Sequence, residues 1–296
     1  MASGQRSVTA HNNMLRVYNP AQFYTTITFP MKLFARKPVL DEASVAWLFA
    51  VYGWCLKQFD AAEFATGTTL VIPSNEYFPG RENSVQGMAG LIFERVQYYA
   101  GMTHWPLQLV DQSWCPSAEP APLQIDGSRR GGHALATDVT YEQPLPVGYD
   151  PAMIGNPEAL ISSFSHTLAQ YLGATAKAPP PGGLQNWPQA TEILAVFLGF
   201  GLMFANSAFT FRTNKCGSCG GANADRTNYL SQYDVTYALA IFCTLKQIQP
   251  GEVLPRLKKS LRSFFKQSMK DIQSREDMLA DLMRQLPPGI ESSNLS

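Results

Sequence analysis

The stretch PEALISSFSHTLAQYL at residues 157–172 decides most of what the sequence predicts about the fold. It has the pattern of one helix, because Asn156 can cap its start, Pro157 suits the first helical position and Gly173 can end it. The apolar residues recur at helical spacing and form one stripe that must face a core: Leu160, Ile161, Phe164, Leu168, Tyr171 and Leu172.

The opposite face of this helix carries the polar candidates. His166 and Gln170 lie there one turn apart, and their neighbours Ser162, Ser163 and Ala169 are small and uncharged. A face in contact with solvent would usually carry Lys or Glu. We therefore expect this face to look into a cavity or onto a second packed layer.

The segment LISSFSHTLAQYLG resembles the active-site helix of zincin-type bacterial metallopeptidases, whose motif is His-Glu-x-x-His. In that family two histidines one turn apart bind zinc, and the glutamate activates water. Here His166 stands at the first histidine position, Thr167 at the glutamate position and Gln170 at the second histidine position. The resemblance implies a third ligand from a later helix, and Glu192 lies where that acidic ligand would be. These four residues are interpreted as a vestigial site, with no catalytic residue and no bound metal expected.

Other interpretations of the same residues stay open. A single histidine on a helix is most often a hydrogen-bonded structural residue, which would also account for His166. Glu192 could be a carboxylate favoured near the start of the apolar helix predicted at residues 191–209. Cys216 and Cys219 have the spacing of half a zinc knuckle or of a redox pair, but no second pair follows, so the sequence does not decide whether they bind metal.

Helical patterns and short β-branched runs set the predicted organisation. Helices are predicted at residues 42–59, at 84–101 and after Ser231, which can form a capping box with Asp234; strands are predicted at 68–73, 107–110 and 133–141. The prediction is an α+β fold: a helix-rich, zincin-like core with a small sheet at residues 1–250, and a C-terminal helical appendage at 251–296 that packs on this core.

Composition limits the partners. The 23 basic and 23 acidic residues give zero formal net charge, so no overall field would attract nucleic acid. The longest apolar run, residues 193–209, is short for a bilayer and is interpreted as a buried helix rather than a transmembrane segment. The start lacks a secretory signal and the five cysteines fit reduced thiols, so a cytoplasmic location is expected. The basic residues of 253–270 predict at most a weak surface contact.

The functional expectation follows from the degenerate motif. We expect a catalytically inactive, metallopeptidase-like protein without a cofactor that acts by binding another protein, in a regulatory or inhibitory interaction. The alternative is a zinc-dependent hydrolase with a rebuilt site, in which His133, Cys216 or Cys219 completes the ligand set around His166.

Overall fold

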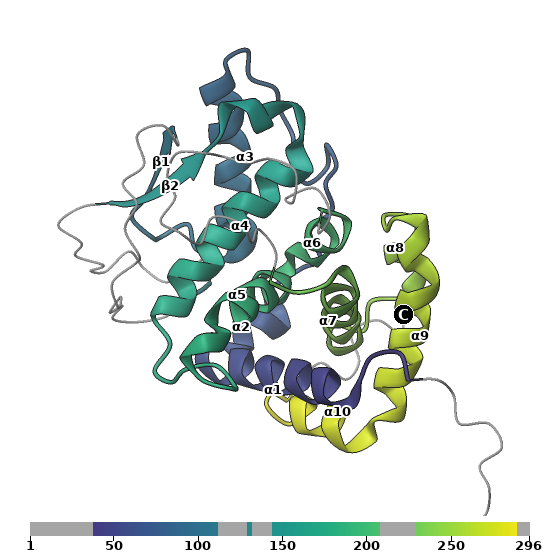
Figure 1. The fold of residues 1–296 in the computed structure, drawn as a ribbon. Coiled ribbons are helices and arrows are strands. Elements are labelled where there is room, and N and C mark those ends of the chain that lie inside the picture. Colours follow the sequence, from purple (N-terminus) through teal and green to yellow (C-terminus); the bar gives the residue numbers. More distant parts are fainter. Residues whose placement is uncertain (1–37, 112–128, 132–143, 208–228, 289–296) are drawn as a thin grey trace, which may run out of the picture. The chain divides into compact units, whose positions relative to one another are not determined.

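The structure is a computed structural model that describes residues 38–111, 129–131, 144–207 and 229–288 (Figure 1). These residues belong to one compact unit that starts at Pro38. They form many helices and a small sheet, which is the predicted α+β class. The helices are α1 Glu42–Gln58, α2 Ala61–Thr66, α3 Val85–Ala100, α4 Pro157–Ala174, α5 Trp187–Ala195, α6 Gly201–Ser207, α7 Gln232–Leu245, α8 Pro250–Val253, α9 Lys259–Ser274 and α10 Glu276–Met283.

Local sequence signals place several helix ends where they were predicted. The backbone N–H of Ser44 donates to the Asp41 carboxylate at 2.9 Å and caps α1. Ser231 and Asp234 form the predicted capping box at the start of α7. Gly101 ends α3 with a φ of 70°, a left-handed conformation that glycine adopts at little cost.

The sheet has two parallel strands, β1 Leu107–Asp111 and β2 Leu145–Tyr149, with Leu107 opposite Leu145. The strand predicted at 107–110 is confirmed, whereas β2 was not predicted and the strand expected at 133–141 lies outside the described residues. Pro146 in β2 has no N–H to donate to the sheet. Its carbonyl accepts a 2.6 Å hydrogen bond from the Tyr171 hydroxyl of α4. The sheet is thus attached to the helix that carries the polar candidates.

The apolar run is buried, as predicted, but it is not one straight helix. It consists of α5, a π-helical turn at Val196–Phe200 and α6, and it starts at Trp187 rather than at residue 191. The stretch Leu184–Asn206 is long and apolar enough to cross a membrane by length and composition alone, but 89% of its most apolar window is buried inside the structure. A core helix of a globular protein has the same properties.

Gly199 causes the interruption. Its φ is 101°, and a Cβ built there would lie 2.1 Å from the Thr69 carbonyl oxygen. Its own carbonyl accepts a 2.9 Å hydrogen bond from the Val71 N–H. The prediction of a strand at 68–73 is therefore wrong: this extended segment packs against a π-helical turn and pairs with no strand among the described residues.

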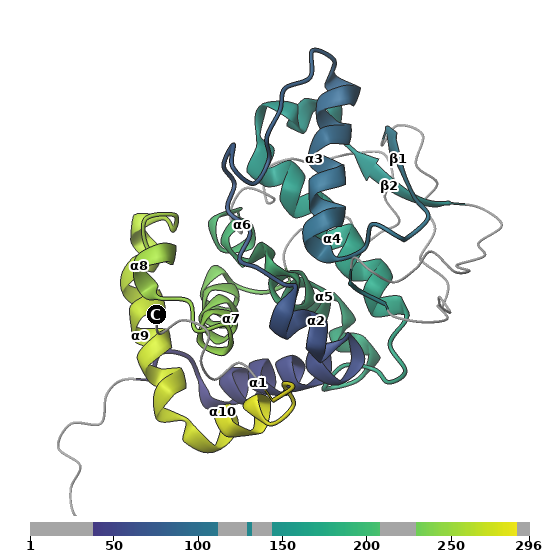
Figure 2. The same ribbon diagram turned by 180° about the vertical axis from the view of Figure 1, so that it is seen from behind.

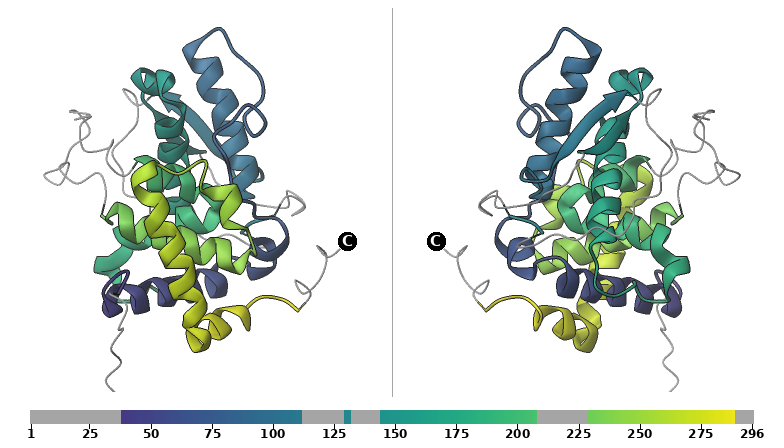
Figure 3. Two further views of the ribbon diagram at one scale, coloured as in Figure 1. Left: turned by 90° about the vertical axis from the view of Figure 1, so that its right-hand side faces the viewer. Right: turned by 90° about the vertical axis from the view of Figure 1, so that its left-hand side faces the viewer.

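The C-terminal helices pack on the body of the protein. Helix α9 runs alongside α7 and α10 lies beside α1 (Figures 1 and 3). Leu257, Leu261 and Phe265 are buried as predicted, while Phe264 is half-buried against the Tyr233 ring, 4.9 Å between centroids. The boundary after residue 250 stays a prediction, although the described helices on both sides of it lie in one compact unit.

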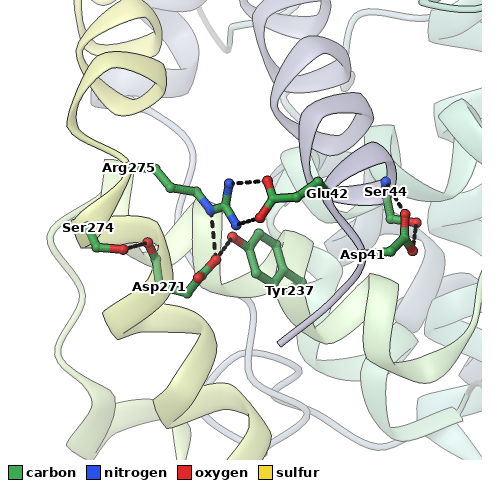
Figure 4. Close-up of polar contacts among 7 residues, drawn as sticks. All are labelled: Asp41, Glu42, Ser44, Tyr237, Asp271, Ser274 and Arg275. Carbon is green, nitrogen blue, oxygen red and sulfur yellow. Dashed lines mark hydrogen bonds and ion pairs between the residues drawn. The ribbon is translucent and has the colours of Figure 1, made fainter. Parts of the chain in front are cut away.

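A polar network joins three of these helices (Figure 4). The Arg275 guanidinium makes two hydrogen bonds of 2.8 Å to the Glu42 carboxylate of α1 and one of 2.8 Å to Asp271 of α9. The Tyr237 hydroxyl of α7 donates to the same Asp271 carboxylate at 2.5 Å. The network links the α9–α10 junction to the body.

Candidate functional site

One face of helix α4 is buried in the core, and part of the opposite face lines a cavity. The predicted apolar stripe is confirmed, because Leu160, Phe164 and Leu168 are fully buried, and α4 packs against α3 (Figure 2). On the opposite face His166 and Gln170 line a cavity of about 750 Å³. Both alternatives for that face are present, since Ser162 and Ala169 are packed in protein while His166 and Gln170 face the cavity.

The cavity lies between the second half of α4, the following loop and the start of α5. Its lining among the described residues is mostly apolar or uncharged: His166, Gln170, Ala174, Ala176, Lys177, Ala178, Pro179, Leu184, Trp187, Pro188, Thr191 and Tyr229. This volume is within the range of about 300–1,000 Å³ that small-ligand pockets occupy.

His166 makes no hydrogen bond to another described residue, and its interpretation as a hydrogen-bonded structural histidine stays a prediction. Its ring stacks on Phe204, with 6.5 Å between ring centroids and 24° between the planes. Burial lowers the pKa of His166 to about 4. At neutral pH the imidazole is therefore uncharged and carries one donor and one acceptor.

Gln170 completes a pair with His166. Its side chain is exposed, lines the same cavity and makes no hydrogen bond within the part of the chain that the structure describes. A carboxamide offers both N–H donors and an oxygen acceptor. The cavity is thus lined by two side chains, one turn apart on α4, that make no hydrogen bond to the described residues.

The Thr167 hydroxyl is hydrogen-bonded within α4. Its hydroxyl donates to the Ser163 carbonyl at 3.1 Å, the common back-bonding arrangement of threonine in helices. Threonine lacks the carboxylate that takes a proton from water in the zincin motif. The residue at the glutamate position of the motif therefore supplies no general base.

Glu192 is buried and hydrogen-bonded to the backbone. Its side chain is only 3% exposed, and its carboxylate accepts hydrogen bonds from the backbone N–H groups of Tyr229 at 2.7 Å and Leu230 at 3.0 Å. Burial raises the pKa of Glu192 to about 7, which these two hydrogen bonds partly oppose and the nearby Asp234 reinforces. Its neighbour Thr191, rather than Glu192, belongs to the described cavity lining. Glu192 thereby fixes the segment that brings Tyr229 to the cavity.

The loop at residues 176–183 forms the rim of the cavity and is held by α1. The indole N–H of Trp47 donates to the Pro181 carbonyl and that of Trp54 to the Ala178 carbonyl, both at 2.9 Å. The backbone N–H of Lys177 donates to the Gln58 side chain at 2.9 Å. These bonds fix the proline-rich rim in one conformation, which reduces the entropy lost when a ligand binds.

Trp187 provides the aromatic wall. Its ring packs edge-on against Trp54 at 5.6 Å, and a Cβ built on Gly173 would lie 3.2 Å from it, so the glycine allows the indole close to α4. Two apolar side chains beside it are exposed for their type, Leu184 at 70% and Tyr229 at 39%. Exposed apolar side chains gathered at a cavity are typical of binding sites.

Metal ligands are not gathered in the described part of the chain. Residues 38–111, 129–131, 144–207 and 229–288 contain no group of three or more His, Cys, Asp or Glu side chains that could hold a metal ion. His133, Cys216 and Cys219, which the alternative function requires, lie outside the described residues. Cys55 and Cys243 are buried thiols, and burial raises the pKa of both.

Sequence reasoning found the helix face but missed most of the cavity wall. Lys177, Trp187 and Tyr229 were not predicted as site residues. The only sequence signal for the rim is the proline- and glycine-rich segment KAPPPGG, which indicates a loop but not which tryptophans hold it. Comparisons with protein-family models, with curated proteins and with solved structures find no match for this chain.

Proposed function

We propose that this protein binds another protein through the cavity beside α4, without hydrolysing it. The observation that carries the proposal is that His166 and Gln170, one turn apart on α4, line a preformed cavity and use their hydrogen-bonding groups on no other described residue. Polar groups held in an apolar pocket fix the orientation of a ligand there.

The donor and acceptor pattern fits a peptide backbone. A neutral imidazole and a carboxamide each offer a donor and an acceptor, and a peptide unit presents one C=O and one N–H. The apolar wall of Leu184, Trp187 and Tyr229 fits an apolar side chain of the same peptide. An extended segment of a protein partner is the ligand that uses both features.

Binding without hydrolysis is supported by the occupied motif positions. Thr167 and Gln170 supply neither the base nor the second imidazole of a zincin, and the Glu192 carboxylate is engaged by two backbone N–H groups. We include in the proposal a zincin-type ancestry, with α4 and α5 as the paired helices, and a cytoplasmic location. The zinc-dependent hydrolase remains the alternative, for which about one zinc per purified chain would argue.

Site-specific photo-cross-linking tests the binding site. A photoreactive phenylalanine analogue at Leu184, which is 70% exposed beside the cavity, should cross-link a defined protein in the cells that naturally make this chain. The same analogue at Tyr98 on α3, which is 61% exposed, is the matched control and should not.

A cavity-filling variant tests whether the cross-link depends on the cavity or only on the surface around it. Ala174→Phe places a ring in the cavity and should abolish the cross-link from position 184, whereas Ala280→Phe on the exposed face of α10 should leave it unchanged. A cross-link that survives Ala174→Phe in a folded protein would contradict binding in the cavity.

A metal-restoring variant tests the ancestry. Gln170→His places a second imidazole one turn from His166 and should raise zinc affinity at least about tenfold in isothermal titration, since two imidazoles at this spacing chelate zinc. Gln185→His, outside the cavity, is the control. Equal zinc affinity in the two variants would remove the zincin ancestry but not the binding function.

A further inference from the structure

We infer that the cavity receives the C-terminal end of its protein partner, with the terminal carboxylate at Lys177 and the last, apolar side chain against Trp187. This inference rests on the proposed function and names the chemistry of the ligand. It follows from the charge and the distribution of groups around the cavity.

Lys177 is the charged residue of the described lining. It is exposed, and its ammonium group makes no ion pair with the described residues. No Asp or Glu belongs to that lining, and His166 is neutral. The cavity therefore offers one positive charge with no counter-charge among its described lining, and the complementary ligand group is an anion.

The polar and apolar groups of the cavity lie within one space. Lys177, the His166–Gln170 pair and the aromatic wall all line the same 750 Å³. A chain terminus presents a carboxylate, a peptide N–H and C=O, and a side chain on adjacent atoms. It satisfies all three parts of the cavity at once, and capture of a terminal carboxylate is one of the recurring modes of peptide recognition.

An internal acidic residue would use the site less fully. An Asp or Glu side chain can reach Lys177, but the same residue then has no apolar side chain for the wall of Trp187 and Leu184. A free terminus with an apolar last residue places charge and apolar surface on one residue. The composition of the lining thus favours the terminus over an internal acidic segment.

The test uses short peptides on the full-length protein. N-acetylated tetrapeptides that end in Leu or Phe are titrated as free acids and as C-terminal amides, by isothermal titration at low and high salt. Because Lys177 is exposed, its ion pair is worth a modest amount, and the free acid should bind about fivefold more tightly than the amide. The difference should shrink at high salt.

Substitutions test whether Lys177 causes the preference for the free acid. Lys177→Met should make the acid and the amide bind equally, while Lys259→Met, an exposed lysine of α9, should leave the fivefold preference in place. Ala174→Phe should abolish the binding of both peptides.

The outcomes distinguish the two proposals. Equal affinity of acid and amide in the wild type, with both lost in Ala174→Phe, would overturn the terminus and keep the cavity as a binding site. A cross-link from position 184 without binding of either peptide would also overturn the terminus. Failure of both the peptides and the cross-link would overturn the proposed function itself.

Discussion

The Glu192 carboxylate accepts a 2.7 Å hydrogen bond from the backbone N–H of Tyr229, across 37 residues of sequence. Tyr229 lines the cavity, so a buried acid on α5 holds part of the cavity wall in place. The vestigial ligand role that the resemblance implies for Glu192 stays a prediction, and the hydrogen bonds of its carboxylate are to Tyr229 and Leu230. These bonds make the stability of the site depend on the ionisation of one group.

The contribution of Glu192 to stability should fall with rising pH. The folded state keeps its proton up to about pH 7, whereas a carboxyl with the ordinary pKa of 4.5 releases it earlier. At this residue the folded state therefore binds more protons over this interval, and the Glu192 contribution to the free energy of unfolding falls by at most about 1.4 kcal/mol per pH unit. In urea unfolding between pH 4.5 and 7, Glu192→Gln should gain stability with rising pH relative to wild type, by at most about 1.4 kcal/mol per pH unit, while the exposed Glu94→Gln should keep the wild-type slope. Equal slopes in wild type and Glu192→Gln would refute the buried acid.

His166 should titrate in the opposite sense. Its imidazole is expected to take a proton only near pH 4 in the folded state, against 6.5 for an unperturbed histidine. Its contribution to stability is full above pH 6.5 and is lost as pH falls from 6.5 to 4, so between pH 4.5 and 6.5 it opposes the Glu192 contribution with a slope of similar size. The Hε1 resonance of His166, assigned by its absence in His166→Gln, should shift with a midpoint near pH 4. A midpoint near 6.5 would show a solvated ring and contradict the stacked, desolvated position.

These two residues show what the sequence could and could not predict. Helical spacing places His166 and Gln170 on one face, and small neighbours indicate that this face is not open to solvent; both inferences need only local periodicity. The partners of Glu192 are 37 and 38 residues away, so no local pattern could reveal them. The caps at Asp41 and Ser231 were predictable because a cap and its N–H partner lie within three residues.

The errors also have local causes. Segment 68–73 has the composition of a strand, but its neighbour is the π-helical turn at Gly199. The Gly199 carbonyl accepts one hydrogen bond, from the Val71 N–H, and this is not a strand ladder. Strand β2 was missed because Pro146 and Gly148 disfavour strands, and only its pairing with β1 makes it one. Long-range contacts override local propensity in both cases.

Gly199 should not tolerate a side chain. Gly199→Ala would force a Cβ to within 2.1 Å of the Thr69 carbonyl oxygen at a φ of 101°, so the expected loss is about 3 kcal/mol or more, or failure to fold. Gly90→Ala in α3 is the matched control, because nothing lies within 4 Å of its built Cβ. The control should gain about 0.5–1 kcal/mol from the lower backbone entropy of alanine. Equal melting temperatures for Gly199→Ala and Gly90→Ala would contradict the close approach of Gly199 to the Thr69 carbonyl.

The network in Figure 4 should be unequally sensitive to substitution. Tyr237→Phe removes a partly buried hydrogen bond to the charged Asp271 and should cost about 1.5–3 kcal/mol in urea unfolding. Glu42→Gln should cost less, because the Glu42 side chain is 71% exposed and its ion pair with Arg275 is screened by solvent. A larger loss for Glu42→Gln would mean that the ion pair, and not the Tyr237 hydroxyl, holds the C-terminal helices.

Native mass spectrometry of the protein mixed with the partner captured from position 184 tests the central claim most directly. A binding role without hydrolysis predicts a complex in which both chains keep their intact masses after prolonged incubation with added zinc, and which Ala174→Phe prevents from forming. Fragments of the partner that accumulate with zinc, and disappear with a chelator or with His166→Ala, would show hydrolysis and contradict a binding protein.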